Sequence, residues 1–243
     1  MKVIAVIPAR YNSKRFPGKP LVEIRNKPLI QWVYEKVKMS NCFDIIVIAT
    51  DDENIYNTVK GFGADVMMTS KKHKSGTDRV AEVAKKIDGE SDDIIVNIQG
   101  DEPLISPITI KKIVMTMKKN REILVATPIC LIKDKNEFCN PNIVKVTVDK
   151  NMFALYFSRS PIPHSSANFY KHIGLYAYRR DFLFKFVRLS VSKLENIERL
   201  EQLRILENGY RIKTVLVRDD SIPVDVPEDV KRIELILKNK VRI

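Results

Sequence analysis

Hydrophobic residues in the first hundred positions occur alternately in short continuous runs and in longer stretches with helical spacing. The continuous runs lack regular polar alternation, so they predict strands that are buried on both faces of a parallel sheet. The longer stretches have apolar residues three and four positions apart, which is typical of amphipathic helices. The predicted strands are residues 2–7, 44–50, 65–68 and 94–98, and the predicted helices are 28–39, 53–61 and 78–87. This alternation predicts βαβ units and an α/β fold.

From residue 142 the pattern changes to shorter strands, predicted at 143–149, 154–158 and 172–178. We interpret residues 142–190, approximately, as a mixed-sheet excursion from a single domain that spans residues 1–243. The excursion could supply a dimer face or a substrate lid.

Apolar spacing then predicts a helix from about 191 to 208, with Gly209 as its stop. A strand at 211–217 returns to the core. The last helix opens near Pro227, which is acceptable in a first turn.

Composition limits the classes of protein to which this chain can belong. No apolar run approaches the ~18 residues that span a bilayer, so we expect a cytoplasmic protein without membrane insertion. The cysteines, Cys42, Cys130 and Cys139, lack metal-ligand spacing and are interpreted as reduced and structural.

The net charge of +12 is compatible with nucleic acid, an anionic membrane or small anionic substrates. The basic residues form short scattered groups, such as Lys71-Lys72-His73-Lys74, and most are interpreted as solvated faces. We find no recognised nucleic-acid module. An electrostatic field that attracts small polyanionic substrates would explain the positive net charge equally well.

The strand at 94–98 is followed by Gln99-Gly100-Asp101-Glu102-Pro103. Parallel sheets bind ligands beyond the carboxyl ends of their strands, so Asp101 and Glu102 are expected to face a ligand crevice. Gly100 permits close approach of the backbone, and carboxylate oxygens suit magnesium. An ordinary acidic turn is the alternative.

The loop after the first strand, residues 8–21, places Arg10, Ser13, Arg15 and Lys19 near a strand end. Such cations and donors suit a triphosphate. Its single glycine excludes both a Walker A loop and a dinucleotide fingerprint, whereas a solvated basic loop remains an alternative.

The segment Ser75-Gly76-Thr77-Asp78-Arg79 opens a predicted helix. Its free amides could bind a nucleobase or phosphate. Helix capping alone would also explain the hydroxyls of Ser75 and Thr77.

Six segments in order resemble the motifs of the 3-deoxy-manno-octulosonate (KDO) cytidylyltransferases, also called CMP-KDO synthetases. They are residues 7–21, 75–79, 96–103, 154–159, 172–176 and 200–204, and the resemblance covers nearly the whole chain. It implies a Rossmann-like nucleotidyltransferase fold of the glycosyltransferase-A-like type. This is a three-layer sandwich with a mostly parallel central sheet.

The resemblance also implies a reaction, which is magnesium-dependent transfer of CMP from CTP to the anomeric hydroxyl of KDO with release of pyrophosphate. It further implies a homodimer that serves lipopolysaccharide or capsule biosynthesis. By the same resemblance, the catalytic residues are Arg10, Lys19, Asp101 and Asp225, of which Asp101 and Asp225 bind magnesium. The nucleotide-binding residues are Ala9, Arg10, Ser13, Arg15, Lys19, Ser75, Gly76, Arg79 and Gln99. The sugar-binding residues are Gln99, Arg159, His172, Tyr176, Glu201 and Gln202. On its own, His172 lies in an apolar strand and could be a satisfied core residue.

Two departures from the family pattern occur. Pro223-Val224-Asp225-Val226 replaces Gly-Val-Asp-Thr, and the segment after Pro163 lacks the tryptophan, arginine and aspartate often found there. The alternative functions are a CMP-sugar synthetase for a nine-carbon sialic-type acid and a non-catalytic module that binds nucleic acid. The latter would show salt-sensitive binding and no pyrophosphate release.

Overall fold

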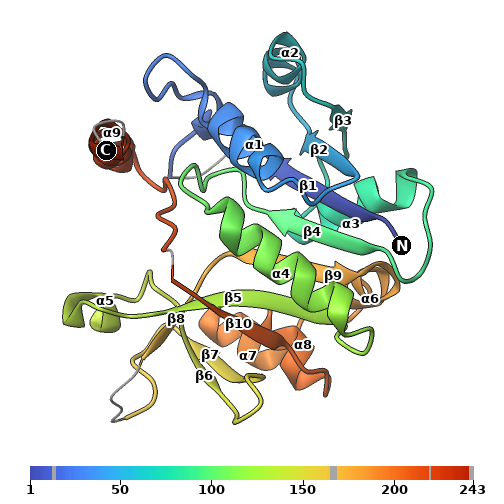
Figure 1. Ribbon diagram of the computed structural model, residues 1–243, viewed down its shortest axis with the longest axis vertical. Helices are drawn as coiled ribbons and strands as arrows, with labels where there is room; N and C mark the ends of the chain where they lie inside the picture. Colours follow the sequence, from blue (N-terminus) through green and yellow to red (C-terminus); the bar gives the residue numbers. More distant parts are fainter. Residues whose placement is uncertain (13–14, 165–168, 219, 241–243) are drawn as a thin grey trace.

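The computed structural model describes residues 1–12, 15–164, 169–218 and 220–240 (Figure 1). Its strands are β1 Val3–Ala9, β2 Ile45–Thr50, β3 Val66–Met68, β4 Ile94–Ile98, β5 Val125–Leu131, β6 Lys145–Val148, β7 Ala154–Ser158, β8 Tyr170–His172, β9 Leu175–Arg179 and β10 Lys213–Val217. Its helices are the 3-10 helix η1 Lys19–Leu21 and the α-helices α1 Leu29–Met39, α2 Glu53–Gly61, α3 Gly76–Lys86, α4 Pro107–Lys119, α5 Lys135–Cys139, α6 Arg180–Phe186, α7 Lys193–Glu198, α8 Leu203–Glu207 and α9 Pro227–Lys240.

The strands of the described residues form one mixed sheet in the order β3-β2-β1-β4-β9-β5-β8-β6-β7, and β10 pairs with β5. β3, β2, β1 and β4 are parallel to one another, as the βαβ alternation predicts. β9 runs antiparallel to β4, and the strand pairs beyond it are antiparallel except that β10 is parallel to β5, so the sheet is mixed. The α/β fold class is therefore confirmed.

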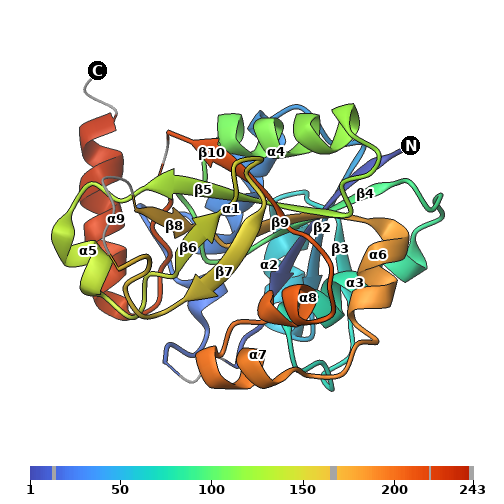
Figure 2. The ribbon, with the colours of Figure 1, turned by 90° about the horizontal axis from the view of Figure 1, so that it is seen from below.

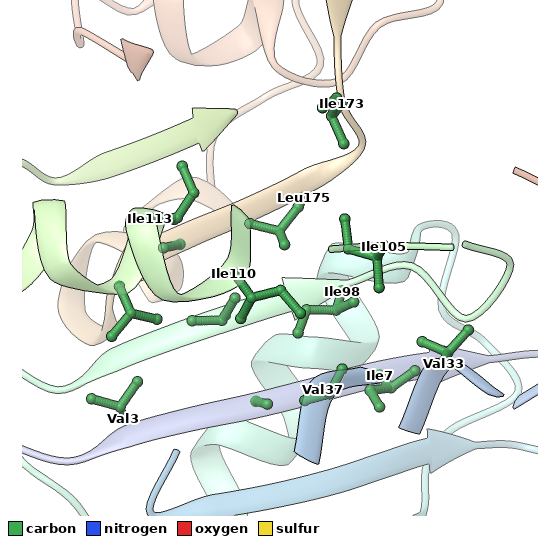
Figure 3. Packing of buried hydrophobic residues seen from close by; sticks show 14 of the residues in the cluster. Val3, Ile7, Val33, Val37, Ile98, Ile105, Ile110, Ile113, Ile173 and Leu175 are labelled. Carbon is green, nitrogen blue, oxygen red and sulfur yellow. The ribbon is translucent and has the colours of Figure 1, made fainter. Parts of the chain in front are cut away.

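The sheet separates two layers of apolar packing. Val3 and Ile7 of β1 pack toward α1 and α4, whereas Ile4 and Val6 pack toward α3 and α6. Figure 3 shows Ile110 and Ile113 of α4 above Ile98 of β4. In Figure 2, α4 lies on one side of the sheet and α8 on the other. Because β1 is buried on both faces, it needs a continuous apolar run.

A third, smaller apolar cluster attaches α9 to the rest of the fold. Ile233 and Leu237 of α9 pack with Ile24, Leu104 and Val224, all of them buried. This contact fixes the segment that precedes α9, and that segment carries Asp225.

The strand predicted at 172–178 is divided into β8 and β9. The pairing with β5 changes from Ile129↔His172 to Ala126↔Ala177, so three positions on β5 are opposed by five on the other strand. The two additional residues produce an irregularity around Gly174. β8 consequently pairs with β6, and β9 pairs with β4.

The helix predicted from 191 to 208 is wrong as a single element. It forms α7 and α8, separated at Arg199, which has a left-handed backbone with φ of 55°. Glu198, at the end of α7, accepts hydrogen bonds from Ser158 Oγ at 2.8 Å and from the Arg159 amide at 2.9 Å. This tertiary contact ends the helix within a continuous apolar pattern.

α4 and β5 lie between the predicted strand at 94–98 and residue 142, a region for which the apolar pattern makes no prediction. Along the described residues, no helix has both the length and the apolar content needed to cross a membrane. Cys42, Cys130 and Cys139 are free; Cys130 is buried and Cys42 half-buried, whereas Cys139 is exposed.

Candidate active site

A cavity of about 420 Å³ lies at the carboxyl ends of β1 and β4. Because these strands are parallel neighbours, the segments that follow them meet at one edge of the sheet. The lining residues in the described part of the chain come from the loop after β1, the start of α3, the end of β4 and the approach to α9. They are Pro8, Ala9, Arg10, Asn12, Arg15, Lys19, Pro20, His73, Lys74, Ser75, Gly76, Arg79, Gln99, Gly100, Asp101 and Asp225.

Two carboxylates distant in sequence meet at Lys19. Its Nζ lies 2.6 Å from Asp101 Oδ2 and 3.7 Å from Asp225 Oδ1. Arg15 Nη2 lies 2.8 Å from the same Asp225 oxygen. The two acids are therefore held around a shared cation.

The backbone brings Asp225 to this position. The Val224 amide donates to the Asp101 carbonyl at 2.8 Å, and Val224 is buried. Asp229 Oδ2 accepts from the amides of Asp225 and Val226 at 2.8 and 3.0 Å. Asp225 is thus supported even though Pro223 and Val226 depart from the family pattern.

The chemistry of this donor set fits magnesium. Asp101 and Asp225 offer hard oxygen ligands around one point of positive charge. Among the described residues, no group of three or more His, Cys, Asp or Glu side chains is arranged to hold a metal. Magnesium commonly takes only one or two carboxylates and completes its shell with water and substrate phosphates.

The start of α3 forms another wall. Ser75 Oγ accepts from the Asp78 amide, and Asp78 accepts from the Ser75 amide, each at 3.1 Å, so Ser75 caps the helix as predicted. The capping prediction for Thr77 is wrong, because its hydroxyl donates to Glu201 Oε2 at 2.6 Å. Arg79 is buried and donates to Thr69 and, at 2.7 Å, to Asp51.

The cavity unites most of the residues expected to bind nucleotide. Ser13 lies outside the described residues. His73 and Lys74 also line the cavity, although the basic run at residues 71–74 predicts a solvated face. Their position immediately before the helix cap at Ser75 was the signal that could have revealed them.

The expected orientation of Glu102 is wrong. The Glu102 amide donates to the Gln99 carbonyl at 3.3 Å, so the chain turns, and the side chain is 6% exposed. Burial raises the pKa of Glu102 to about 7, with a further contribution from Asp101. Only Asp101 of this pair lines the cavity.

Comparisons with known proteins identify the family of the chain. A family model described as Cytidylyltransferase matches residues 4–214. The chain is 47% identical to 3-deoxy-manno-octulosonate cytidylyltransferase of Syntrophotalea carbinolica, over 98% of this chain and 99% of that protein. It is 49% identical to the protein of the same name from Thermodesulfovibrio yellowstonii, over 98% of each chain. The chain belongs to the 3-deoxy-manno-octulosonate cytidylyltransferase family. It is therefore a nucleotidyltransferase.

Solved structures support the same family and fold. The structure of CMP:2-keto-3-deoxy-manno-octonic acid synthetase complexed with CTP has a TM-score of 0.94 and 40% identity, and the match covers 99% of this chain and 100% of that one. A 4-diphosphocytidyl-2C-methyl-D-erythritol synthase from Anaerococcus prevotii has a TM-score of 0.64 at 13% identity, with 98% of each chain covered. The latter likeness supports the fold alone.

Of the residues that family resemblance assigns to the sugar, Gln99 alone is among those that line the cavity in the described part of the chain. Glu201 accepts a hydrogen bond from Thr77, which follows the lining residue Gly76 in α3. Gln202 is 6% exposed, and burial raises the pKa of Tyr176 well above its usual value. Arg159 is held by main-chain oxygens, with Nε 2.8 Å from the Glu198 carbonyl. The sugar assignment of these residues stays a prediction.

His172 is expected to make the protein less stable in acid. Burial lowers its pKa to about 3, below the ordinary value of 6.5. The unfolded chain therefore binds the extra proton first, so this contribution to stability is complete above pH 6.5 and is lost as pH falls toward 3. Urea midpoints at about pH 7 and about pH 4.5 should differ less in His172→Gln than in the wild type. His164→Gln, at an exposed histidine, is the control; equal pH dependence of the wild type and His172→Gln would contradict the prediction.

Gly100→Ala is expected to destabilise the protein by about 1–3 kcal/mol, because the added Cβ overpacks the strand end. That carbon would lie 2.8 Å from the Pro8 carbonyl oxygen and 3.2 Å from Ile30 Cδ1. Denaturant unfolding measures the effect. Gly61→Ala is the matched control, since its Cβ would meet no atom within 4 Å. Equal stability of Gly100→Ala and the wild type would show that the close approach is not required.

Proposed function

We propose that this protein transfers CMP from CTP to the anomeric hydroxyl of KDO, giving CMP-KDO and pyrophosphate. The central observation is the cavity in which Lys19 joins Asp101 and Asp225 at the carboxyl ends of parallel strands. The names of the close relatives support the two substrates.

The cationic side chains of the cavity can reduce the repulsion between the two anionic substrates of this reaction. CTP and the sugar acid are both anions, so the hydroxyl must approach a negatively charged α-phosphate. Arg10, Arg15 and Lys19 line the cavity and can offset the charge on the triphosphate and the leaving pyrophosphate. Arg15 and Lys19 are tied to the two acids, which restricts where their charges lie.

Asp101 and Asp225 are proposed to hold magnesium. When bound, the ion would supply Lewis acidity at the reacting hydroxyl and at the α-phosphate. In the protein itself, Lys19 partly neutralises the acid pair and keeps the two carboxyl groups together.

The sugar is proposed to bind beside Gln99, toward Arg159, His172, Tyr176, Glu201 and Gln202. Two buried atoms in this group, Tyr176 OH and Gln202 Nε2, have no hydrogen-bond partner among the described residues. Buried polar groups ordinarily have partners, so unpaired ones favour a polar ligand there. A carboxylated and hydroxylated sugar offers both donors and acceptors.

We further propose that residues 142–190 provide the dimer face of a cytoplasmic homodimer in lipopolysaccharide or capsule biosynthesis. β7 is an edge strand, and its Leu155 is 61% exposed, which supports a contact there. Sedimentation at micromolar concentration tests the dimer. A monomer mass would remove this part of the proposal.

The reaction is tested by following pyrophosphate release from CTP and magnesium with KDO, its 8-amino analogue or N-acetylneuraminate, and with magnesium omitted. Magnesium-dependent release with KDO is expected. Preference for another sugar acid would change the assignment of the sugar-binding residues, but the reaction would still be transfer of CMP. No release with any of the three would contradict the proposed function.

A further inference from the structure

The loop between β3 and α3 is anchored by a residue outside the cavity. Glu82, on α3, accepts from the Ser70 amide at 2.9 Å and pairs with His73 Nε2 at 2.5 Å. Lys86 Nζ donates to the other Glu82 oxygen at 2.6 Å. One carboxylate therefore fixes both ends of the turn at residues 70–73.

Glu82 is suited to this task because it remains ionised. Burial alone would raise its pKa, but hydrogen bonds from Lys86, the Ser70 amide and His73 lower the pKa of Glu82 to about 2. The contact with His73 is thus charge-assisted near neutral pH. Such a contact holds the His73 side chain in one position.

The anchored turn leads directly into the cavity wall. His73 and Lys74 line the cavity, and Ser75 and Gly76 follow as the cap and first residue of α3. The His73 side chain is 20% exposed, so it combines contact with Glu82 and access to the cavity. Glu82 does not line the cavity that the described residues form.

We infer that Glu82 is a positioning residue for nucleotide binding, which acts by holding His73 and the adjoining cavity wall in a binding-competent position. The inference rests on the proposed function and adds His73 to the nucleotide contacts. Removing the carboxylate charge weakens the His73 contact and leaves Lys19, Asp101 and Asp225 unchanged. The loss therefore falls on CTP affinity and spares the chemical step.

The test measures CTP binding and steady-state kinetics in Glu82→Gln. We expect the Kd and KM for CTP to rise about tenfold, with kcat within about twofold of the wild type. Lys86→Met is the matched control, since it removes the other partner of Glu82 and leaves His73 and Ser70 in place; its Kd should equal that of the wild type. A general structural effect would lower kcat or thermal stability in both variants without this selective rise in Kd.

A double-mutant cycle tests the route through His73. If Glu82 acts through His73, then His73→Gln also raises the Kd for CTP, and the double variant binds no more weakly than either single variant. Additive losses of CTP affinity in the double variant, or an unchanged Kd in Glu82→Gln, would overturn this inference and leave the proposed function intact. If Glu82→Gln fails to fold, an unchanged Kd in His73→Gln overturns it equally. Failure of the wild type to bind CTP would overturn the proposed function as well.

Discussion

Replacing Asp101 or Asp225 with asparagine is expected to lower the turnover number at least about a hundredfold while the fold stays intact. Both side chains line the cavity, and both lie beside Lys19 Nζ, at 2.6 and 3.7 Å. Asparagine keeps the shape of the side chain and removes the negative charge that would hold magnesium. The change should therefore appear in kcat and in the magnesium requirement, and hardly in the thermal midpoint.

Asp88→Asn is the matched control for this experiment. Asp88 is exposed and precedes β4, at the end of that strand opposite to Asp101. Its turnover should equal that of the wild type. Near-normal turnover of Asp101→Asn or Asp225→Asn at saturating magnesium would remove that residue from the mechanism.

The second large effect is expected for Lys19→Met, which should lower kcat/KM about a hundredfold or more. Methionine approximates the length of the side chain and removes the ammonium group, so the triphosphate loses a cation and the acid pair loses its shared partner. The Lys19 side chain is 12% exposed, which makes its charge less screened than that of a surface lysine.

Lys27→Met controls for the loss of a lysine ion pair elsewhere. Lys27 Nζ lies 2.7 Å from Glu35 Oε2, and Lys27 does not line the cavity of the described residues. It should retain wild-type kcat/KM. Equal losses in the two variants would show that the effect of Lys19 is not specific to the site.

The parallel half of the fold was predictable because its strands are buried on both faces. β1 and β4 therefore have continuous apolar sequences that the pattern alone identifies. The division between β8 and β9 depends on two additional residues opposite β5, and such a shift leaves no periodic signal. The break between α7 and α8 likewise depends on a contact of Glu198 with distant residues.

Some residues of the site could be predicted from the sequence and others could not. The position of Asp101 after a buried strand predicts its place in the site. Asp225 could be predicted only from family resemblance, because Lys19, its partner in space, is distant in sequence. Glu102 was misplaced because the turn after β4 directs adjacent side chains differently. His73 was missed because its pairing with Glu82 requires the packing of a loop on α3.

The most direct test follows the α-phosphorus of CTP. With α-labelled CTP, KDO and magnesium, the label should appear in CMP-KDO, and pyrophosphate should form in equal amount. Label that remains in CTP, or that appears only as free CMP, would contradict transfer to the sugar.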